Sequence, residues 1–464
     1  MQSFRQFPAV ATILIKLSLV GCTSTAEDHL EDLLDGSVEH EQVKHEFLLA
    51  RERAVGPLLD AFDDHRFAPV RGQLVEILFS LSMRLDDTRL SDALSERLTS
   101  DPDPDVRALI AESAVLYNRV DMAAAFLQAL EDEAPLVRQH ALAGLAAMES
   151  RLDSAQQHTL AVRSRELLQD SSAGVRLEAQ TRTAAIVAKW QAQATQLQLQ
   201  AMLSEAEDLH RRAIEYARGS KQAYYGLGWF LCEIDRHEQG FELLRDHGLL
   251  LNVPRIQEAP VIDGRLDDGA WATAARAGSL YKFFWESPAW LEPDGIVSHF
   301  LATHTAQTLY IGFHGHDDHP DSLVAKIIEP LNPTDDGQSN DGFWSDDIIE
   351  LMLDTDLDRK SFIHMGINSR GVRADQFNFM GPDGPYDDRA TYAAQVEVGA
   401  HIGEDFWSLE IAFPFDQRHM SRPQAGQVWG FNLVRNFRGQ EYLQWVRTYG
   451  SGLQPQHFGF LRFP

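Results

Sequence analysis

The feature that most constrains the fold of this chain is a change of hydrophobic period near residue 252. Up to about Leu251, apolar residues recur at the spacing of amphipathic helices. Beyond it, aromatic residues, glycine and alternation of apolar with polar residues take over, which is typical of strands. With 464 residues the chain can form more than one core, so we predict a multidomain α + all-β protein. The expected segments are a signal peptide at 1–21, a helical domain at 22–251 and a β domain at 252–464.

The helical part contains a repeated Val-Arg step. Each copy follows a Pro or Gly closely and precedes an apolar helical face, and the copies are Val70-Arg71, Val106-Arg107, Val137-Arg138 and Val175-Arg176. The pattern resembles HEAT repeats, in which helix pairs stack into a solenoid because no pair buries its apolar face alone. This implies a HEAT-like α-solenoid that serves as a spacer or binds a protein partner. The stretch from His210 to Leu244 resembles a tetratricopeptide-like pair, and a capping pair of the solenoid is the alternative.

The N-terminus has the pattern of an exported lipoprotein. Arg5 precedes an apolar run that is too short to span a membrane, and small residues follow. Leu19-Val20-Gly21-Cys22 resembles the bacterial lipobox, which implies that Cys22 carries lipid as the first residue of the mature protein. A simple cleaved or uncleaved anchor is the alternative. We therefore expect a location in the bacterial cell envelope, anchored to the outer membrane and facing the periplasm or the exterior.

The acidic balance of the chain excludes one large class of partner. The sequence has 41 Lys and Arg against 69 Asp and Glu, a net charge of −28. Nucleic acids and anionic membrane surfaces attract positive charge, so we expect neither as a partner. Only two cysteines are present, and Cys232 lies in an apolar helical stretch where we expect a buried, inert thiol.

The β part contains six motifs in a characteristic order. They are PVIDGRLDDGAW, TLYIGFHGHDDHP, FWSDDIIELMLDTD, FWSLEIAFPF, VWGFNLVRN and HFGFLRF. Together they resemble the family 9 carbohydrate-binding module, a DOMON-like β-sandwich. We expect an antiparallel sandwich of about a dozen strands. The expected strands include Ala259–Ile262, Asp347–Asp354, Ser361–Asn368 and Val428–Phe437, and the expected core tryptophans are Trp271, Trp407 and Trp429.

The resemblance also implies a binding site. In xylanase-attached members of the family, two tryptophans hold the sugar, and Trp344 matches the first of them. Glu350 and Asn368 match polar positions on the following strands. The second tryptophan would fall at about Gly452, so this half of the aromatic clamp is missing. The candidates for its replacement are Trp285, Trp290 and Trp445. The alternatives are loop packing for Trp344 and a fold-supporting hydrogen bond or salt bridge for Glu350.

Two patterns raise the question of metal ions. His314 to His319 spells H-x-H-x-D-H, as in metallo-β-lactamase-like hydrolases, but the surrounding strands fit the sandwich instead. Asp354, Asp356 and Asp358 resemble the start of a calcium loop. Arg359 stands where an EF-hand needs glycine, so an EF-hand is excluded. A Ca²⁺ site of another kind remains open, with plain acidic turns as the alternative.

These observations predict a lipid-anchored, exported carbohydrate-binding protein. The chain lacks the G-x-S-x-G, P-loop and dinucleotide-binding motifs, so we expect no catalysis of its own, only an accessory role in glycoside hydrolysis. The first alternative is an envelope scaffold whose sandwich has lost sugar binding and which binds proteins. The second is a haem-binding DOMON-like module with His364 and either Met352 or Met365 as ligands.

Overall fold

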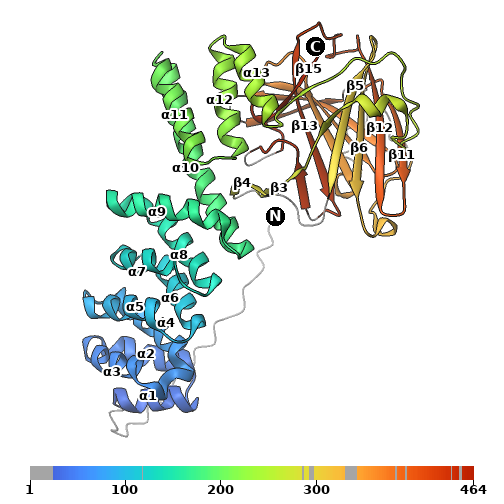
Figure 1. Cartoon of the computed structure of the whole chain (residues 1–464). Helices are drawn as coiled ribbons and strands as arrows, with labels where there is room; N and C mark the ends of the chain where they lie inside the picture. Colours follow the sequence, from blue (N-terminus) through green and yellow to red (C-terminus); the bar gives the residue numbers. More distant parts are fainter. Residues whose placement is uncertain are drawn as a thin grey trace, which may run out of the picture. The chain divides into compact units, whose positions relative to one another are not determined.

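A computed structural model describes most of the chain (Figure 1). The described residues are 25–117, 119–284, 287–291, 297–329, 342–381, 384–391, 394–439, 441–448 and 452–464. The chain forms two compact units, Met1–Leu160 and Ala161–Pro464. Helices come first and antiparallel sheets follow, which confirms the predicted fold class. Within the described residues, no helix is both long and apolar enough to cross a membrane.

The first unit is built from short helices in sequential contact. They are α1 (Ala26–Asp35), α2 (His40–Ala50), α3 (Glu52–Asp63), α4 (Arg71–Ser82), α5 (Thr88–Ser100), α6 (Pro104–Leu116), α7 (Ala123–Ala129) and α8 (Pro135–Ala147), with α9 (Ser154–Glu166) at the boundary. Helix α4 packs on α6 and α6 on α8, while α5 packs on α7. Alternate helices therefore form two layers, and each pair buries its apolar face against the next.

The Val-Arg steps lie at the start of α4, α6 and α8, in every second helix. Arg71 is buried and donates to Asp101 Oδ1 at 3.1 Å. Arg107 is also buried and donates through Nε and Nη2 to both carboxylate oxygens of Asp132, at 2.7 and 2.8 Å. Its Nη1 donates to the Asp101 carbonyl at 2.7 Å. The repeated arginine thus has a structural role, because it ties the start of one helix to the loops that flank neighbouring helices. That the repeats are of the HEAT type remains a prediction.

The second unit has four further helices before its sheets. They are α10 (Ala173–Leu199), α11 (Leu203–Tyr216), α12 (Lys221–Glu233) and α13 (His237–Asp246). The ring of Trp229 on α12 stacks on Phe460 at 5.5 Å, and the Tyr225 hydroxyl donates to the Phe458 carbonyl at 2.9 Å. After α13, β1 (Leu250–Asn252) pairs in parallel with the last strand of the chain. The predicted boundary at 251/252 therefore runs through a strand that α12 and α13 help to cover. Cys232 on α12 is buried, as predicted, and burial raises the pKa of its thiol to about 12.

Burial also lowers the pKa of His210 on α11 to about 4. His210 is therefore neutral in the folded protein, whereas in the unfolded chain it takes up a proton below about pH 6.5. We expect the stability to fall as the pH drops from about 6.5 towards 4. Replacing His210 by Leu should reduce the loss of unfolding free energy between pH 7 and 5 by about 2 kcal/mol. Urea unfolding at the two pH values measures this. The exposed His237→Gln should keep the full pH dependence, and an unchanged dependence in His210→Leu would contradict the assignment.

Two sheets make up the rest of the second unit. Their further strands are β2 (Ala275–Ala277), β3 (Tyr281–Phe284), β4 (Ser287–Leu291), β5 (Ser298–His304), β6 (Thr308–His316), β7 (Ile348–Asp354), β8 (Ser361–Asn368), β9 (Arg373–Gly381), β10 (Gly384–Thr391), β11 (Glu397–Ile402), β12 (Phe406–Pro414), β13 (Val428–Phe437), β14 (Glu441–Gln444) and β15 (Gly459–Arg462). The large sheet has the order β10-β9-β8-β7-β13-β14-β3-β4, with β15 beside β13 and β1 beside β15. The small sheet has the order β11-β12-β6-β5-β2. Every described pair except β1–β15 is antiparallel.

The two sheets share one core, which makes the fold a sandwich. Phe300 of the small sheet contacts Phe431 on β13 and Trp445 just after β14, with ring centroids 5.3 and 5.1 Å apart. From β7, Ile349, Leu351 and Leu353 enter this core. Strand side chains alternate between faces, so Ile348, Glu350 and Met352 lie on the outer face. The predicted core tryptophans, Trp271, Trp407 and Trp429, are all buried, as expected.

One predicted strand is wrong. Strands β8 and β13 have the predicted bounds, but Ala259–Ile262 forms no strand. The backbone of this region hydrogen-bonds to side chains instead. The Val261 N–H donates to Asp268 Oδ2 at 2.8 Å, and the N–H groups of Asp263 and Gly264 donate to Glu410.

Glu410 on β12 joins two of the motifs that identified the sandwich. Its carboxylate accepts from the N–H groups of Asp263, Gly264 and Leu266 at 2.8, 2.7 and 3.2 Å, and from Trp271 Nε1 at 2.7 Å. Glu410 is fully buried. The motifs PVIDGRLDDGAW and FWSLEIAFPF therefore form one structural unit that closes the outer face of the small sheet.

Candidate functional site

Trp344 lies on the outer face of the large sheet, in a single 3₁₀ turn that precedes β7. Its indole covers Gly366 on β8, where a Cβ atom would come within 2.7 Å of Cζ3. The ring stacks on His364 with centroids 5.1 Å apart and planes 29° apart. Asn436 Nδ2 donates to the Trp344 carbonyl at 3.0 Å and so holds the turn. The indole is only half-buried, and Nε1 has no hydrogen-bond partner among the described residues.

Glu350 adds a carboxylate next to this aromatic group. Its Oε2 lies 2.8 Å from His364 Nε2, and its side chain is 16% exposed. Tyr442 on β14 lies close to Glu350. Burial raises the pKa of the Tyr442 hydroxyl, and the negative charge of Glu350 contributes to the same increase. The outer face thus combines one indole, one carboxylate, one imidazole and one phenol. Sequence reasoning missed Tyr442 and gave His364 no role in sugar binding, although the strand alternation places His364 on the same face as Glu350.

Asn368, the other predicted polar contact, is fully buried at the end of β8. Its Nδ2 donates to the Ile327 carbonyl at 2.7 Å and to Asp346 Oδ2 at 3.1 Å. Its Oδ1 accepts from the N–H groups of Arg370 and Val372, both at 3.0 Å. Asn368 therefore fixes the segment around Ile327, which packs beside Trp344. Both ends of its side-chain amide hydrogen-bond to protein groups and not to a ligand.

The candidates for a second tryptophan lie elsewhere. Trp445 is in the sandwich core, and Trp285 is outside the described residues. Trp290 lies on β4, edge-on to Tyr281 at 5.1 Å, and β4 ends the large sheet on the side away from β8. Gly452, the position implied for the second tryptophan, lies over Gln444 of β14, where a Cβ would be 3.5 Å from Nε2. Strands β8 and β14 are three strand spacings apart, about 14 Å.

The predicted acidic turn brings its three carboxylates together. Oxygen atoms of Asp354, Asp356 and Asp358 lie within 4.8 Å of one another. Burial, together with the charges of Asp358 and Asp356, raises the pKa of Asp354 to about 7. The N–H groups of Asp358 and Arg359 donate to Asp354 at 3.2 and 2.9 Å. Oxygen-only donors suit Ca²⁺, which would need further oxygen atoms from carbonyls or water. The donor set therefore fits Ca²⁺ in part.

A Ca²⁺ ion at this turn would stabilise the folded state, because the unfolded chain does not hold the three carboxylates together. We expect millimolar Ca²⁺ to raise the melting temperature by about 2–4 °C, equivalent to about 1 kcal/mol. Differential scanning calorimetry with Ca²⁺ and with EDTA measures the shift. Asp356→Asn should remove the response. The exposed Asp416→Asn is the control, and an equal response in both variants would show that the turn holds no ion.

The H-x-H-x-D-H stretch is not assembled as a metal cluster. His314 on β6 stacks on His299 and Phe406, at 5.0 and 4.6 Å. His316 Nε2 contacts Asp318 Oδ1 at 3.0 Å. Asp317 Oδ1 accepts from the His319 N–H at 2.9 Å and from Arg438 Nη2 at 2.6 Å. Asp317 thus serves as a structural turn residue, as the sandwich pattern predicts.

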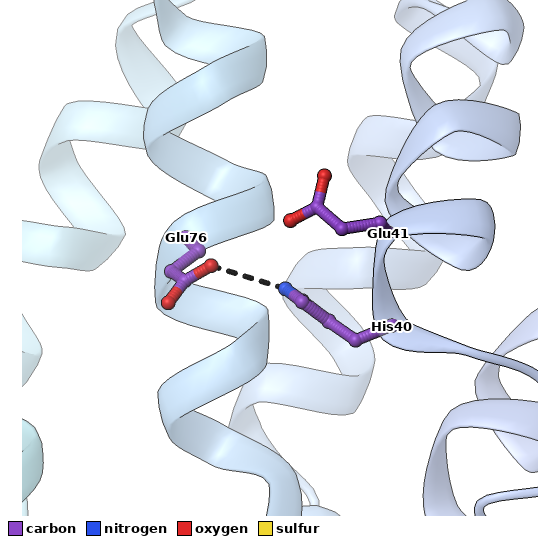
Figure 2. Close-up of side chains that lie close together, drawn as sticks. All are labelled: His40, Glu41 and Glu76. Carbon is purple, nitrogen blue, oxygen red and sulfur yellow. Dashed lines mark hydrogen bonds and ion pairs between the residues drawn. The ribbon is translucent and has the colours of Figure 1, made fainter.

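A cluster that the sequence did not indicate lies in the first unit. His40 and Glu41 start α2 and meet Glu76 of α4, and Figure 2 shows the three side chains converging. His40 Nε2 lies 3.0 Å from Glu76 Oε2. Lys44 Nζ lies 3.4 Å from Glu41 and 3.9 Å from Glu76. Because this ammonium contacts both carboxylates and balances one of their two negative charges, we interpret the cluster as an ion-pair network that joins two helices.

Only one of the two proposed methionine ligands lies on the same face of the sheet as His364. Met365 enters the sandwich core, whereas His364 lies on the opposite face of the sheet. Met352 is beside His364 on the outer face but is fully buried against Phe362 and Phe458. His364 itself is engaged with Glu350 and Trp344. These contacts leave the candidate ligands packed against protein groups.

Comparisons with known proteins found structural similarity only. No family model matches the chain, and no curated protein matches it. A family 9 carbohydrate-binding module from Caldicellulosiruptor kristjanssonii, solved with cellotriose, is 14% identical and covers 46% of this chain and 93% of its own, with a TM-score of 0.33. The CpcE–CpcF phycocyanin lyase complex of Nostoc sp. PCC7120 is 20% identical over 33% of this chain and 96% of its own, with a TM-score of 0.27. Kap121p bound to Ste12p is 13% identical over 48% of this chain and 24% of its own, with a TM-score of 0.28. All three scores are below 0.5, so the fold assignment rests on the sheet topology of this chain.

Proposed function

We propose that the outer face of the large sheet binds a neutral oligosaccharide, with Trp344 as the platform. The observation that carries the proposal is the partly exposed indole held over Gly366 beside the partly exposed carboxylate of Glu350. An indole of this kind can cover the apolar C–H face of a pyranose. A carboxylate and a phenol at its edge can accept and donate hydrogen bonds to sugar hydroxyls.

Each group has a defined part in this proposal. The imidazole of His364 supports the indole from one side and fixes Glu350 through the 2.8 Å contact. The carboxylate keeps further lone pairs for sugar hydroxyls, since an ionised carboxylate can accept about four hydrogen bonds. Tyr442 lies at the side of Glu350 that is away from β8, because β13 and β14 follow β7 in the sheet. The ring of the sugar would thus lie between β8 and β14.

In this proposal the Trp344 site binds sugar without catalysis. The protein is anchored in the cell envelope, so the site faces the cell exterior or the periplasm. Cys22 and the apolar run before it support export and lipid anchoring; both lie outside the described residues. The helical first unit would then serve as a spacer or as a surface for a protein partner.

Isothermal titration of soluble gluco-, xylo-, manno- and galacto-oligosaccharides into the protein tests the proposal. We expect at least one of them to bind. Glu350→Gln should weaken that binding about fivefold, because one charged acceptor becomes neutral while the shape is kept. Glu397→Gln, an exposed change on the small sheet, should bind as the original protein does. If no oligosaccharide of the panel binds, the proposal is wrong.

An envelope scaffold is the second candidate, and Gly452 favours it. The resemblance implies a tryptophan at this position, and a glycine supplies no second indole, as expected if sugar binding has been lost. A stoichiometric protein partner that co-purifies with the chain and still binds Glu350→Gln would support the scaffold.

A further inference from the structure

A cavity of about 710 Å³ lies in the second unit, lined by α10, the start of α12 and the pair β3–β4. Strand β4 packs against α10 (Figure 1). The described lining residues include three cations, Arg176, Arg218 and Lys221, and no carboxylate. This is unusual in a chain with a net charge of −28. The volume is that of a site for a small ligand such as one or two sugar rings.

Three buried polar atoms on the cavity wall have no hydrogen-bond partner among the described residues. They are Thr183 Oγ1, Gln180 Oε1 and Trp290 Nε1. The Thr183 residue is only 4% exposed. Most buried polar groups in folded proteins are paired, so three unpaired ones on a single cavity indicate a partner that the protein does not supply. An indole N–H only donates, an amide oxygen only accepts, and a hydroxyl does both. The partner must therefore offer both hydroxyl donors and oxygen acceptors.

The cationic groups on the cavity wall favour a ligand that carries a negative charge. Arg176 Nη1 donates to the carbonyls of Asp170 and Ser171 at 2.7 and 2.9 Å, which holds the guanidinium at the first turn of α10. Lys221 is the first residue of α12, a 13-residue helix whose N-terminus carries a partial positive charge. Arg218 is exposed in the loop just before it. A cation-lined cavity at a helix start attracts a carboxylate or a similar anion.

Aromatic rings form the remaining wall. Trp290 meets Tyr281 edge-on at 5.1 Å, and Lys221 Nζ lies 5.1 Å from the centre of the Tyr281 ring. Such a wall accepts the apolar face of a ring-shaped ligand.

We infer that this cavity binds an acidic sugar, a polyhydroxylated ring that carries a carboxylate. The cations would take the carboxylate, Thr183, Gln180 and Trp290 would take the hydroxyls, and the aromatic wall would take the ring. Four strands separate β4 from β8 in the large sheet, so the cavity is distinct from the Trp344 site. The inference does not depend on the proposed function of that site.

Isothermal titration of digalacturonic acid and of the neutral galactose dimer into the full chain tests the inference. We expect the acidic dimer to bind at least about tenfold more tightly than the neutral one, and more weakly at high salt. Arg218→Gln and Thr183→Val should each weaken it about fivefold; the valine keeps the shape of threonine without its hydroxyl. Arg212→Gln, an exposed change on α11, and Trp344→Ala should leave binding unchanged.

Three results would overturn the inference. The first is no preference for the acidic dimer over the neutral one. The second is displacement of the acidic dimer by an equal concentration of inorganic sulfate, which would show that the cavity recognises an anion and no sugar. The third is loss of acidic-dimer binding in Trp344→Ala, which would place that ligand at the Trp344 site and leave the proposed function standing.

Discussion

Replacing Glu410 by Gln is expected to destabilise the second unit by about 3–5 kcal/mol. The buried carboxylate accepts four hydrogen bonds, and it does so without a described basic partner. Glutamine keeps one acceptor oxygen but turns an NH₂ group towards N–H donors, so at least two buried donors lose their partner. Each unpaired buried donor costs about 1–3 kcal/mol.

Thermal unfolding followed by circular dichroism measures this effect. At about 2–4 °C per kcal/mol, the melting temperature should fall by roughly 10 °C. Glu397→Gln is the matched control. It makes the same chemical change at an exposed residue of β11, the strand next to β12. Equal melting temperatures for the two variants would contradict a structural role for Glu410.

The second large effect concerns the aromatic clamp. Trp344→Ala should weaken oligosaccharide binding by at least about tenfold, since it removes the whole platform. Gly452→Trp should instead strengthen binding by about tenfold, because it adds a second platform on the far side of the sugar. The position accepts a side chain: the backbone of Gly452 is outside the left-handed region, and a Cβ would be in ordinary contact with Gln444.

Titration of one oligosaccharide into both variants measures these changes. Gly269→Trp is the control for the gain, because a Cβ at Gly269 meets no atom within 4 Å and the residue lies outside the large sheet. An equal gain in Gly269→Trp would show that the added indole acts as a nonspecific sticky surface.

The fold could be predicted because most of its helices and strands follow from local patterns of apolar, polar and turn residues in the sequence. Strands such as β8 and β13 are apolar, long and flanked by turn residues, so their bounds follow from the sequence. Ala259–Ile262 also looked like a strand, but the Val261 N–H bonds to Asp268, and just beyond the segment the Asp263 N–H bonds to Glu410, far along the chain. When a side chain accepts the backbone hydrogen bonds that a neighbouring strand would otherwise accept, the local alternation of apolar and polar residues does not reveal it.

The candidate site was predictable only in part, for a related reason. Alternation along β7 placed Glu350 on the outer face, and the family resemblance singled out Trp344. Which other side chains lie beside Glu350 and Trp344 depends on how the strands pair. Strand pairing places His364 and Tyr442 at the site, whereas Asn368 is buried and hydrogen-bonds within the protein. The unpaired atoms around Trp290 likewise come from helices and strands that are far apart in the sequence.

A double-mutant cycle tests the central claim, that sugar binds on the outer face between β8 and β14. The same oligosaccharide is titrated into the original protein, Trp344→Ala, Gly452→Trp and the variant with both changes. We predict that Gly452→Trp binds about tenfold more tightly than the original and that adding Trp344→Ala abolishes most of this gain, since the two indoles hold one ring. Strictly additive effects, or binding that Trp344→Ala does not change, would contradict the claim.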